Sequence, residues 1–261
     1  MCILFIACNA HSRYPLVIAG NRDEFYERPT APAAFWTDRP DILAGRDLKE
    51  GGTWLGVAKA GRIAAITNFR NPRTLKEHAP SRGQLVSRYL MAGESAPHFI
   101  ESLGNEAGRY NGFNIVLGNH NALWYYSNVS GRAEKLPPGI HGISNHFLNT
   151  PWPKVERART RLGSLLKERN DPSPDDVFEV LADTTRPDDS ELPDTGVGIE
   201  WERILSPLFV RSPHYGTRSS TCIFIDTRGA VRFTERTYNN TPSHAATRMF
   251  EFTIEEARNA S

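Results

Sequence analysis

The first apolar segment of this chain begins at its second residue. Residues 2–7 read Cys-Ile-Leu-Phe-Ile-Ala, an apolar run without polar alternation. Such a run is typical of a strand that is buried on both faces. A second apolar run, Leu16–Ala19, follows a polar connection rich in turn residues, so the two segments predict a hairpin. The first predicted strand is therefore expected to be buried on both of its faces.

Strand and helix patterns alternate in blocks along the rest of the chain. Further strands are expected at 53–58, 63–67, 114–117, 123–126, 221–226 and 231–234, and helices at 81–92, 96–103, 153–169 and 173–182. Residues 27–45, which contain Pro29, Pro32 and Pro40, are expected to form an irregular loop. Strands, then helices, then strands again predict an α+β fold with antiparallel sheets.

The length and composition indicate a single domain that spans residues 1–261. No change of composition marks a second domain, and 261 residues fit one large domain. Residues 184–215 are rich in Pro, Asp, Gly and Ser, and we expect them to form a surface excursion or a lid over a site. The longest apolar stretches are well short of the ~20 residues that a membrane span requires.

Charge and cysteine content narrow the classes of function. The formal net charge is +1, from 31 basic and 30 acidic residues, so no overall field favours nucleic acid or an anionic membrane. The three cysteines form no disulfide framework and no zinc-binding spacing, and neither a metal nor a cofactor is expected. We expect a cytoplasmic protein with a small-molecule partner, and the sequence carries no indication of an oligomeric state.

Cys2 is the first candidate for chemistry. Removal of Met1, which a small second residue permits, would leave a thiol and a free α-amine on one residue. An α-amine has a pKa of roughly 7.7–8.0 and can accept the thiol proton, so Cys2 would need no separate base. The alternative is a small apolar residue at the start of a buried strand, because free cysteines are often buried.

A polar block, Asn21-Arg22-Asp23-Glu24, follows the second predicted strand. Pairing of the two strands in the hairpin would bring this block close to Cys2. An arginine beside a thiol favours the thiolate, and a carboxylate can hold the α-amine in place. The alternative is a solvated strand end.

Three asparagines and one arginine also stand near strand ends. Asn68, Asn114 and Asn145 could each direct an amide donor at a developing oxyanion, or could serve as ordinary turn residues. Arg218, before the last predicted hairpin, could bind a substrate carboxylate, hold Asp23, or form a surface salt bridge of little energetic value.

Several segments together resemble the NRDE family, also called the Transport and Golgi Organization protein 2 family. They span nearly the whole chain: Met1-Cys2, Tyr14–Tyr26, Arg28-Pro29-Thr30, Gly51–Gly56, Thr67–Arg70, Ser81-Arg82-Gly83, Gly112-Phe113-Asn114, Gly142–Asn145 and Ser219-Ser220-Thr221. More distantly, the pattern is similar to that of choloylglycine hydrolases and penicillin V acylases. Those enzymes have the N-terminal-nucleophile (Ntn) hydrolase fold, so the resemblance implies a four-layer αββα sandwich.

The resemblance to these hydrolases implies roles for individual residues. Cys2 matches the nucleophile position, Asn68 an oxyanion-hole asparagine, Asn145 a second asparagine, and Arg218 a late arginine before a strand. The polar block departs from the hydrolase pattern, in which Arg and Asp stand three positions apart. Here Arg22 and Asp23 are adjacent, and Asn21 and Glu24 have that spacing, so any of the four could face Cys2.

Two classes of function follow from the resemblance. The first is hydrolysis or acyl transfer at an amide or thioester bond, with Cys2, Arg22, Asp23, Asn68 and Asn145 as catalytic residues. Asn21, Glu24, Asn114 and Arg218 would then bind substrate. The second is a non-catalytic carrier of lipid or haem on the same scaffold, because eukaryotic members of the family have been tied to secretory organisation, lipid or acyl-CoA metabolism, and haem movement.

Overall fold

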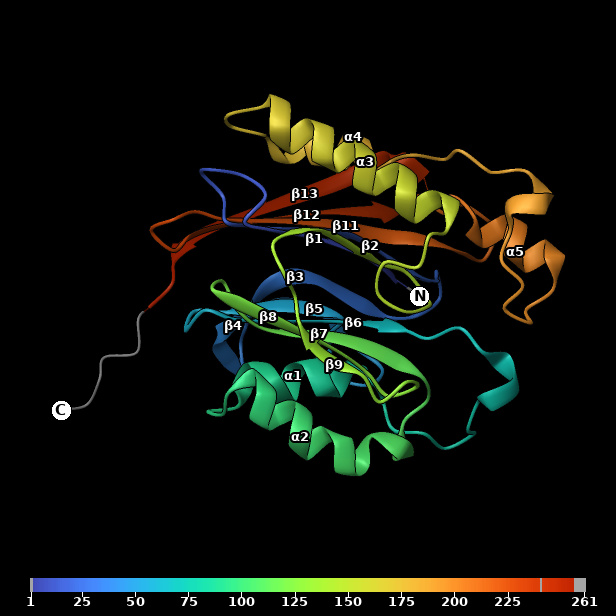
Figure 1. Cartoon of the computed structure of the whole chain (residues 1–261), viewed down its shortest axis with the longest axis horizontal. Helices are drawn as coiled ribbons and strands as arrows, with labels where there is room; N and C mark the ends of the chain where they lie inside the picture. Colours follow the sequence, from blue (N-terminus) through green and yellow to red (C-terminus); the bar gives the residue numbers. More distant parts are fainter. Residues whose placement is uncertain (1, 240, 256–261) are drawn as a thin grey trace.

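Two antiparallel sheets form the centre of the molecule, as the computed structural model shows for residues 2–239 and 241–255 (Figure 1). The first sheet contains, in spatial order, β10 (Gly139–Ile143), β1 (Cys2–Cys8), β2 (Leu16–Phe25), β11 (Tyr215–Ile225), β12 (Ala230–Asn239) and β13 (Thr241–Thr253). The second contains β3 (Thr30–Trp36), β4 (Arg39–Asp47), β5 (Leu55–Ala58), β6 (Arg62–Asn68), β7 (Phe113–Asn119), β8 (Ala122–Ser127) and β9 (Ala133–Lys135).

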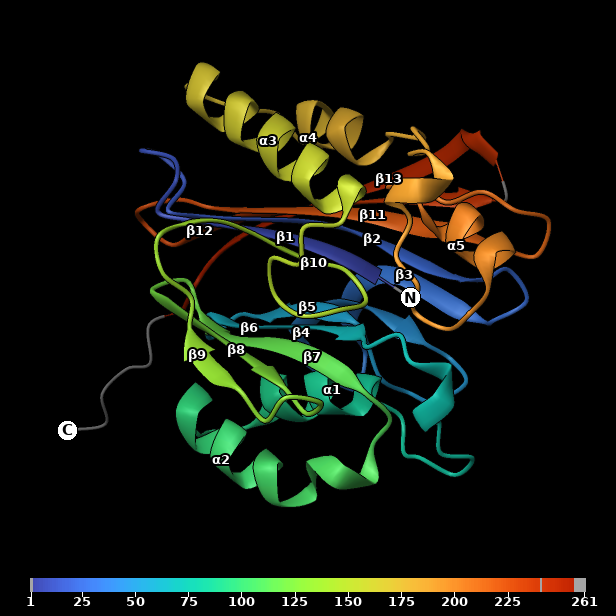
Figure 2. The same cartoon turned by 45° about the vertical axis from the view of Figure 1, so that its right-hand side comes forward.

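Helices cover the outer face of each sheet, as Figures 1 and 2 show from two directions. Helices α1 (Gly83–Met91) and α2 (Ala96–Glu106) pack on the second sheet, and α3 (Pro153–Glu168) and α4 (Pro174–Leu181) pack on the first. The remaining helical segments are α5 (Ile199–Leu205) and the short η1 (Pro72–Thr74), η2 (Ala107–Arg109) and η3 (Asp189–Glu191). The predicted four-layer αββα sandwich is confirmed.

In the described part of the chain, no helix has the length and apolar character needed to cross a membrane.

Strand β1 lies between β10 and β2, and its side chains alternate between two cores. Leu4 and Ile6 belong to the core between the sheets, whereas Ile3 and Phe5 belong to the core under α3 and α4. Both faces of the strand are thus buried, which explains why its sequence lacks polar alternation.

The prediction of an irregular loop at residues 27–45 was wrong. Strands β3 and β4 occupy this segment, and β3 forms an edge of the second sheet. Pro32 lies where the β3–β4 register shifts, between Ala31 and Ala34. A proline is tolerated in a strand at an edge or a bulge, because no ladder hydrogen bond is then lost. The prolines therefore mark an irregular edge rather than the absence of strands.

The backbone crosses itself closely where Gly52 meets the start of α1. A Cβ atom on Gly52 would lie 2.5 Å from the carbonyl carbon of Gly83 and 2.7 Å from the Gln84 nitrogen. Because both atoms are backbone, we expect Gly52→Ala to force α1 outward and to lower the free energy of unfolding by about 1–3 kcal/mol. Urea unfolding measures this, with Gly93→Ala as the control, since nothing lies within 4 Å of a Cβ there. Equal stability of the two variants would contradict the prediction.

Candidate functional site

A cavity of about 430 Å³ opens beside Cys2, with walls from both sheets and from the segment before α1. Its lining includes Cys2, Arg22, Asp23, Glu24, Arg28, Thr30, Arg46, Asp47, Trp54, Ile66, Asn68, Ser81, Arg82, Arg218, Ser219, Glu235 and Tyr238. A volume of this order suits a small organic molecule. Among residues 2–239 and 241–255, no three or more His, Cys, Asp or Glu side chains are arranged to hold a metal ion.

Cys2 is the first residue of β1 and pairs directly with Arg22 of β2. Paired residues of neighbouring strands have their side chains on the same face, so Cys2 and Arg22 both point toward the cavity. Burial raises the pKa of the Cys2 thiol to about 11, and the Arg22 guanidinium opposes that rise. The thiol is consequently protonated at neutral pH, and its reaction requires a base.

The alternation of β2 separates the four residues of the polar block. Arg22 and Glu24 lie on the cavity face of the strand. Asn21 lies on the opposite face, where its amide donates to the carbonyls of Leu181 and Leu208, and its oxygen accepts from Ser220. Asn21 is therefore fully engaged outside the cavity.

Asp23 also lies on the outer face of β2, at a point where the strand end borders the cavity. Its Oδ1 accepts a hydrogen bond of 2.7 Å from the Thr217 hydroxyl, and the Tyr215 hydroxyl donates to its backbone carbonyl. Burial raises the pKa of the Asp23 carboxyl, while the cations Lys154 and Arg70 oppose the rise. Asp23 thus presents a buried carboxyl beside the start of β1.

Only Asn68 of the three candidate asparagines lines the cavity. It is the last residue of β6, and its side-chain amide makes no hydrogen bond within the described part of the chain. The Asn145 amide instead donates to the Asn68 carbonyl at 3.1 Å. The Asn114 amide donates to Thr67 and to the His146 carbonyl. Asn68 therefore offers a free amide donor, and Asn145 fixes the backbone that carries it.

A buried charge cluster, which the sequence did not predict, lies behind Asn145. Arg70 donates to Asn145 Oδ1 at 3.1 Å and forms an ion pair of 2.7 Å with Glu202 of α5. Lys154 lies nearby and donates to the Leu205 carbonyl. Burial, together with the nearby charge of Arg70, lowers the pKa of Lys154 to about 7. The cluster fastens the 184–215 segment to the strand end that holds Asn68; a lid role for that segment stays a prediction.

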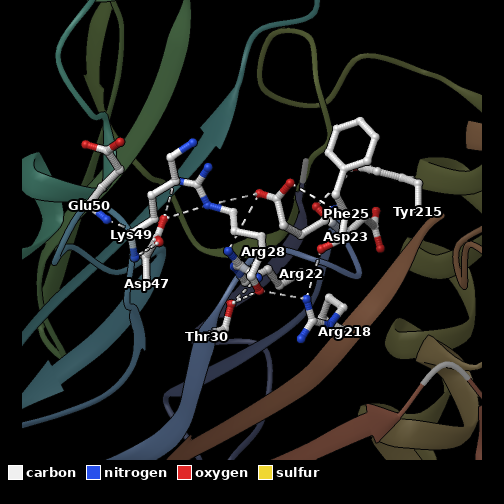
Figure 3. A network of polar contacts seen from close by, with 11 residues as sticks. Arg22, Asp23, Phe25, Arg28, Thr30, Asp47, Lys49, Glu50, Tyr215 and Arg218 are labelled. Atoms are coloured by element: carbon white, nitrogen blue, oxygen red, sulfur yellow. Dashed lines mark hydrogen bonds and ion pairs between the residues drawn. The ribbon is translucent and has the colours of Figure 1, made fainter.

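Five arginines line the cavity, and the sequence predictions included only Arg22 and Arg218. Arg28 forms an ion pair of 2.6 Å with Asp47. Figure 3 shows Arg22, Arg28 and Arg218 gathered near Thr30. The remaining two are Arg46 and Arg82. Arg82 lies in the Ser81-Arg82-Gly83 segment that the family resemblance already includes. That segment was the one available signal for Arg82.

Glu235 of β12 was also missed. Its side chain reaches across to the second sheet, where Oε1 accepts a hydrogen bond of 2.6 Å from the Ala33 backbone nitrogen. Burial raises the pKa of this carboxyl. No local sequence pattern distinguishes Glu235 from the other charged residues of the last hairpin.

The arrangement of the two sheets and the helices is that of the Ntn-hydrolase fold. Conjugated bile acid hydrolase from Clostridium perfringens aligns with a TM-score of 0.51 over 100% of this chain and 99% of the enzyme, at 9% identity. A second structure of that enzyme aligns with a TM-score of 0.50 over 99% of both chains, also at 9% identity. At this identity the similarity shows the fold alone.

The chain belongs to the Transport and Golgi organisation 2 family, whose profile matches residues 1–240. The Transport and Golgi organization protein 2 homolog of Homo sapiens is 36% identical over 98% of this chain and 100% of the human protein. The homolog of Bos taurus is 34% identical, with the same coverage. The family resemblance found in the sequence is thereby confirmed.

Proposed function

We propose that this protein is an N-terminal-nucleophile enzyme that cleaves an amide or thioester bond through Cys2, after removal of Met1. One observation carries the proposal. The first residue of a central strand is a cysteine whose side chain borders a cavity of about 430 Å³. A cysteine that served only to fill the core would need no such opening.

The reaction begins with transfer of the thiol proton to the α-amine of Cys2. The sulfur then bonds to the substrate carbonyl carbon, and the carbonyl oxygen becomes an oxyanion that accepts a hydrogen bond from the Asn68 amide. Such a donor contributes roughly 2.7–4 kcal/mol in the transition state. The bond to the leaving group breaks, and the α-ammonium returns the proton to that group. Water attacks the resulting acyl-cysteine, giving a carboxylic acid and the free thiol.

Arg22 and Asp23 assist from opposite faces of β2. Arg22 lies across from Cys2 and stabilises the thiolate by its positive charge. Asp23 borders the cavity beside the start of β1, where its carboxyl can hold the α-amine. Adjacent residues can thus act on the sulfur and on the amine of one terminal cysteine.

Intact-protein mass spectrometry tests both parts of the proposal. We expect the purified protein to lack Met1, and to gain the mass of an acyl group during turnover of a simple thioester such as S-butyryl-2-mercaptoethanol. Peptide mapping should place the added acyl group on Cys2 rather than on Cys8. Retention of Met1 on protein that still hydrolyses the thioester would overturn the proposed mechanism.

A further inference from the structure

Two arginines of the cavity wall, Arg82 and Arg218, form no ion pair with a carboxylate of the described residues. Arg82 donates to the Gly112 carbonyl, and Arg218 donates to the carbonyls of Phe25 and Arg28. Among the described residues, no carboxylate lies within ion-pair distance of either guanidinium. Both side chains are half-buried, and burial lowers the pKa of each.

The other arginines of the cavity are already paired. Arg28 contacts Asp47, Arg46 contacts Asp38, and Arg22 lies 3.6 Å from Glu24. The carboxylates of Glu24 and Asp47 are thus occupied by these partners. Acidic and basic residues line the cavity in equal numbers, and the charge of Glu24 also acts on Arg82 and Arg218, but among the described residues no carboxylate forms an ion pair with either of these two guanidinium groups.

The two free arginines come from different sides of the cavity. Arg82 precedes α1, which packs on the second sheet. Arg218 belongs to β11 of the first sheet and is the extra residue of a bulge, since Thr217 pairs with Asp23 and Ser219 with Arg22. Bulges redirect single side chains beside functional sites. The bulge in β11 places Arg218 among the cavity-lining residues, with Ser219 and Cys2.

We propose that the substrate carries an oxyanion group, a carboxylate, sulfonate or phosphate, that Arg82 and Arg218 bind while Cys2 attacks the acyl group. Guanidinium groups match the geometry of these oxyanions and form paired hydrogen bonds with them. Trp54 and Ile66 give the cavity apolar surface for the remainder of the substrate. The inference rests on the proposed function, since it describes the substrate of that same site.

Matched thioesters test the inference. One series keeps a butyryl group and varies the thiol among 2-mercaptoethanol, 3-mercaptopropionate and 2-mercaptoethanesulfonate. A second keeps 2-mercaptoethanol and compares butyryl with succinyl, which places the charge on the acyl side. We expect kcat/KM for an anionic member of one series to exceed that of its neutral partner by about tenfold or more, the effect of one charged hydrogen bond. A phosphorylated thiol in the first series distinguishes phosphate from the other oxyanions.

Substitution of the two arginines identifies the site. Arg82→Gln and Arg218→Gln should each remove about tenfold of the advantage of the anionic substrate and leave the neutral substrate little changed. Arg46→Gln removes the same charge from the wall, but from an arginine paired with Asp38 and stacked on Trp36, so the preference should persist. If a glutamine variant is unstable, the preference for the anionic thioester is measured instead in Arg82→Lys and Arg218→Lys. These variants keep the positive charge but lose the paired hydrogen bonds of the guanidinium group.

The outcomes separate this inference from the proposed function. Cys2-dependent hydrolysis without a preference for anions would overturn the inference and leave the proposed function intact. Calorimetric binding of the same thioesters to the Cys2→Ala variant provides a second measurement. Anion-dependent binding that Arg82→Gln weakens, without any Cys2-dependent hydrolysis, would support an anion site and overturn the enzyme. Equal binding of neutral and anionic thioesters would overturn the inference.

Discussion

Replacement of Cys2 by alanine is expected to lower thioester hydrolysis by a factor on the order of 10⁴ or more. Removal of a nucleophile leaves only substrate binding and oxyanion stabilisation, which account for a small residual rate. The fold should survive, because the substitution removes a single sulfur atom at the border of an existing cavity. Steady-state kinetics and thermal unfolding of the same preparation measure the two effects.

Cys8 provides the control for this substitution. It lies at the other end of β1, is half-buried, and is absent from the cavity wall. We therefore expect Cys8→Ala to retain full activity. The carrier hypothesis predicts something different, namely that lipid or haem binds equally well to the Cys2→Ala and unaltered proteins and that neither hydrolyses a thioester. That result would decide against the enzyme.

Loss of Glu202 is expected to lower the free energy of unfolding by about 3–5 kcal/mol, the range for breaking one side of a buried ion pair. Its carboxylate lies 2.7 Å from Arg70, and the two side chains are 4% and 5% exposed. Glu202 also accepts hydrogen bonds from the backbone and the hydroxyl of Thr195. In Glu202→Ala the charge of Arg70 remains buried without its carboxylate, which is the main source of the cost. Urea unfolding followed by circular dichroism measures it.

Arg203, which lies on the same helix as Glu202, provides a matched control through its exposed ion pair with Asp189. Arg203 contacts Asp189 of η3, and both side chains are largely exposed. Since exposed ion pairs contribute little, Arg203→Ala should change the stability by less than about 1 kcal/mol. If Arg203→Ala and Glu202→Ala lowered the free energy of unfolding by similar amounts, the prediction that the buried Arg70–Glu202 pair contributes more than an exposed pair would be contradicted.

Much of the fold could be predicted because its signals are local. The apolar run of residues 2–7 identified a buried strand, and α4, which a capping box at Ser173 begins, lies within the helix expected at 173–182. The strands β3 and β4 were missed, because Pro32 and Pro40 are compatible with an irregular edge that local sequence cannot distinguish from a loop. Strand β9 lacks a strong apolar pattern, since it has only three residues at the edge of the second sheet.

The site depends on register and on distant contacts, which local patterns do not contain. Which residues of the polar block face Cys2 follows from the pairing of Cys2 with Arg22. The side-chain amide of Asn145 donates to the carbonyl of Asn68, which is 77 residues away in the sequence, so no local pattern predicts this contact. Arg70 and Glu202 are 132 residues apart, so nothing in either neighbourhood predicts their ion pair.

The central place of β1 has a practical consequence for handling the protein. Cys2 is paired with Arg22 of β2, and from Leu4 onward the strand is paired with β10 as well, so the start of β1 is fixed at the border of the cavity. In the proposed mechanism, an affinity tag fused ahead of Cys2 would block release of the α-amine that accepts the thiol proton. Recombinant protein for assays should accordingly carry its tag after residue 261, or be expressed without one.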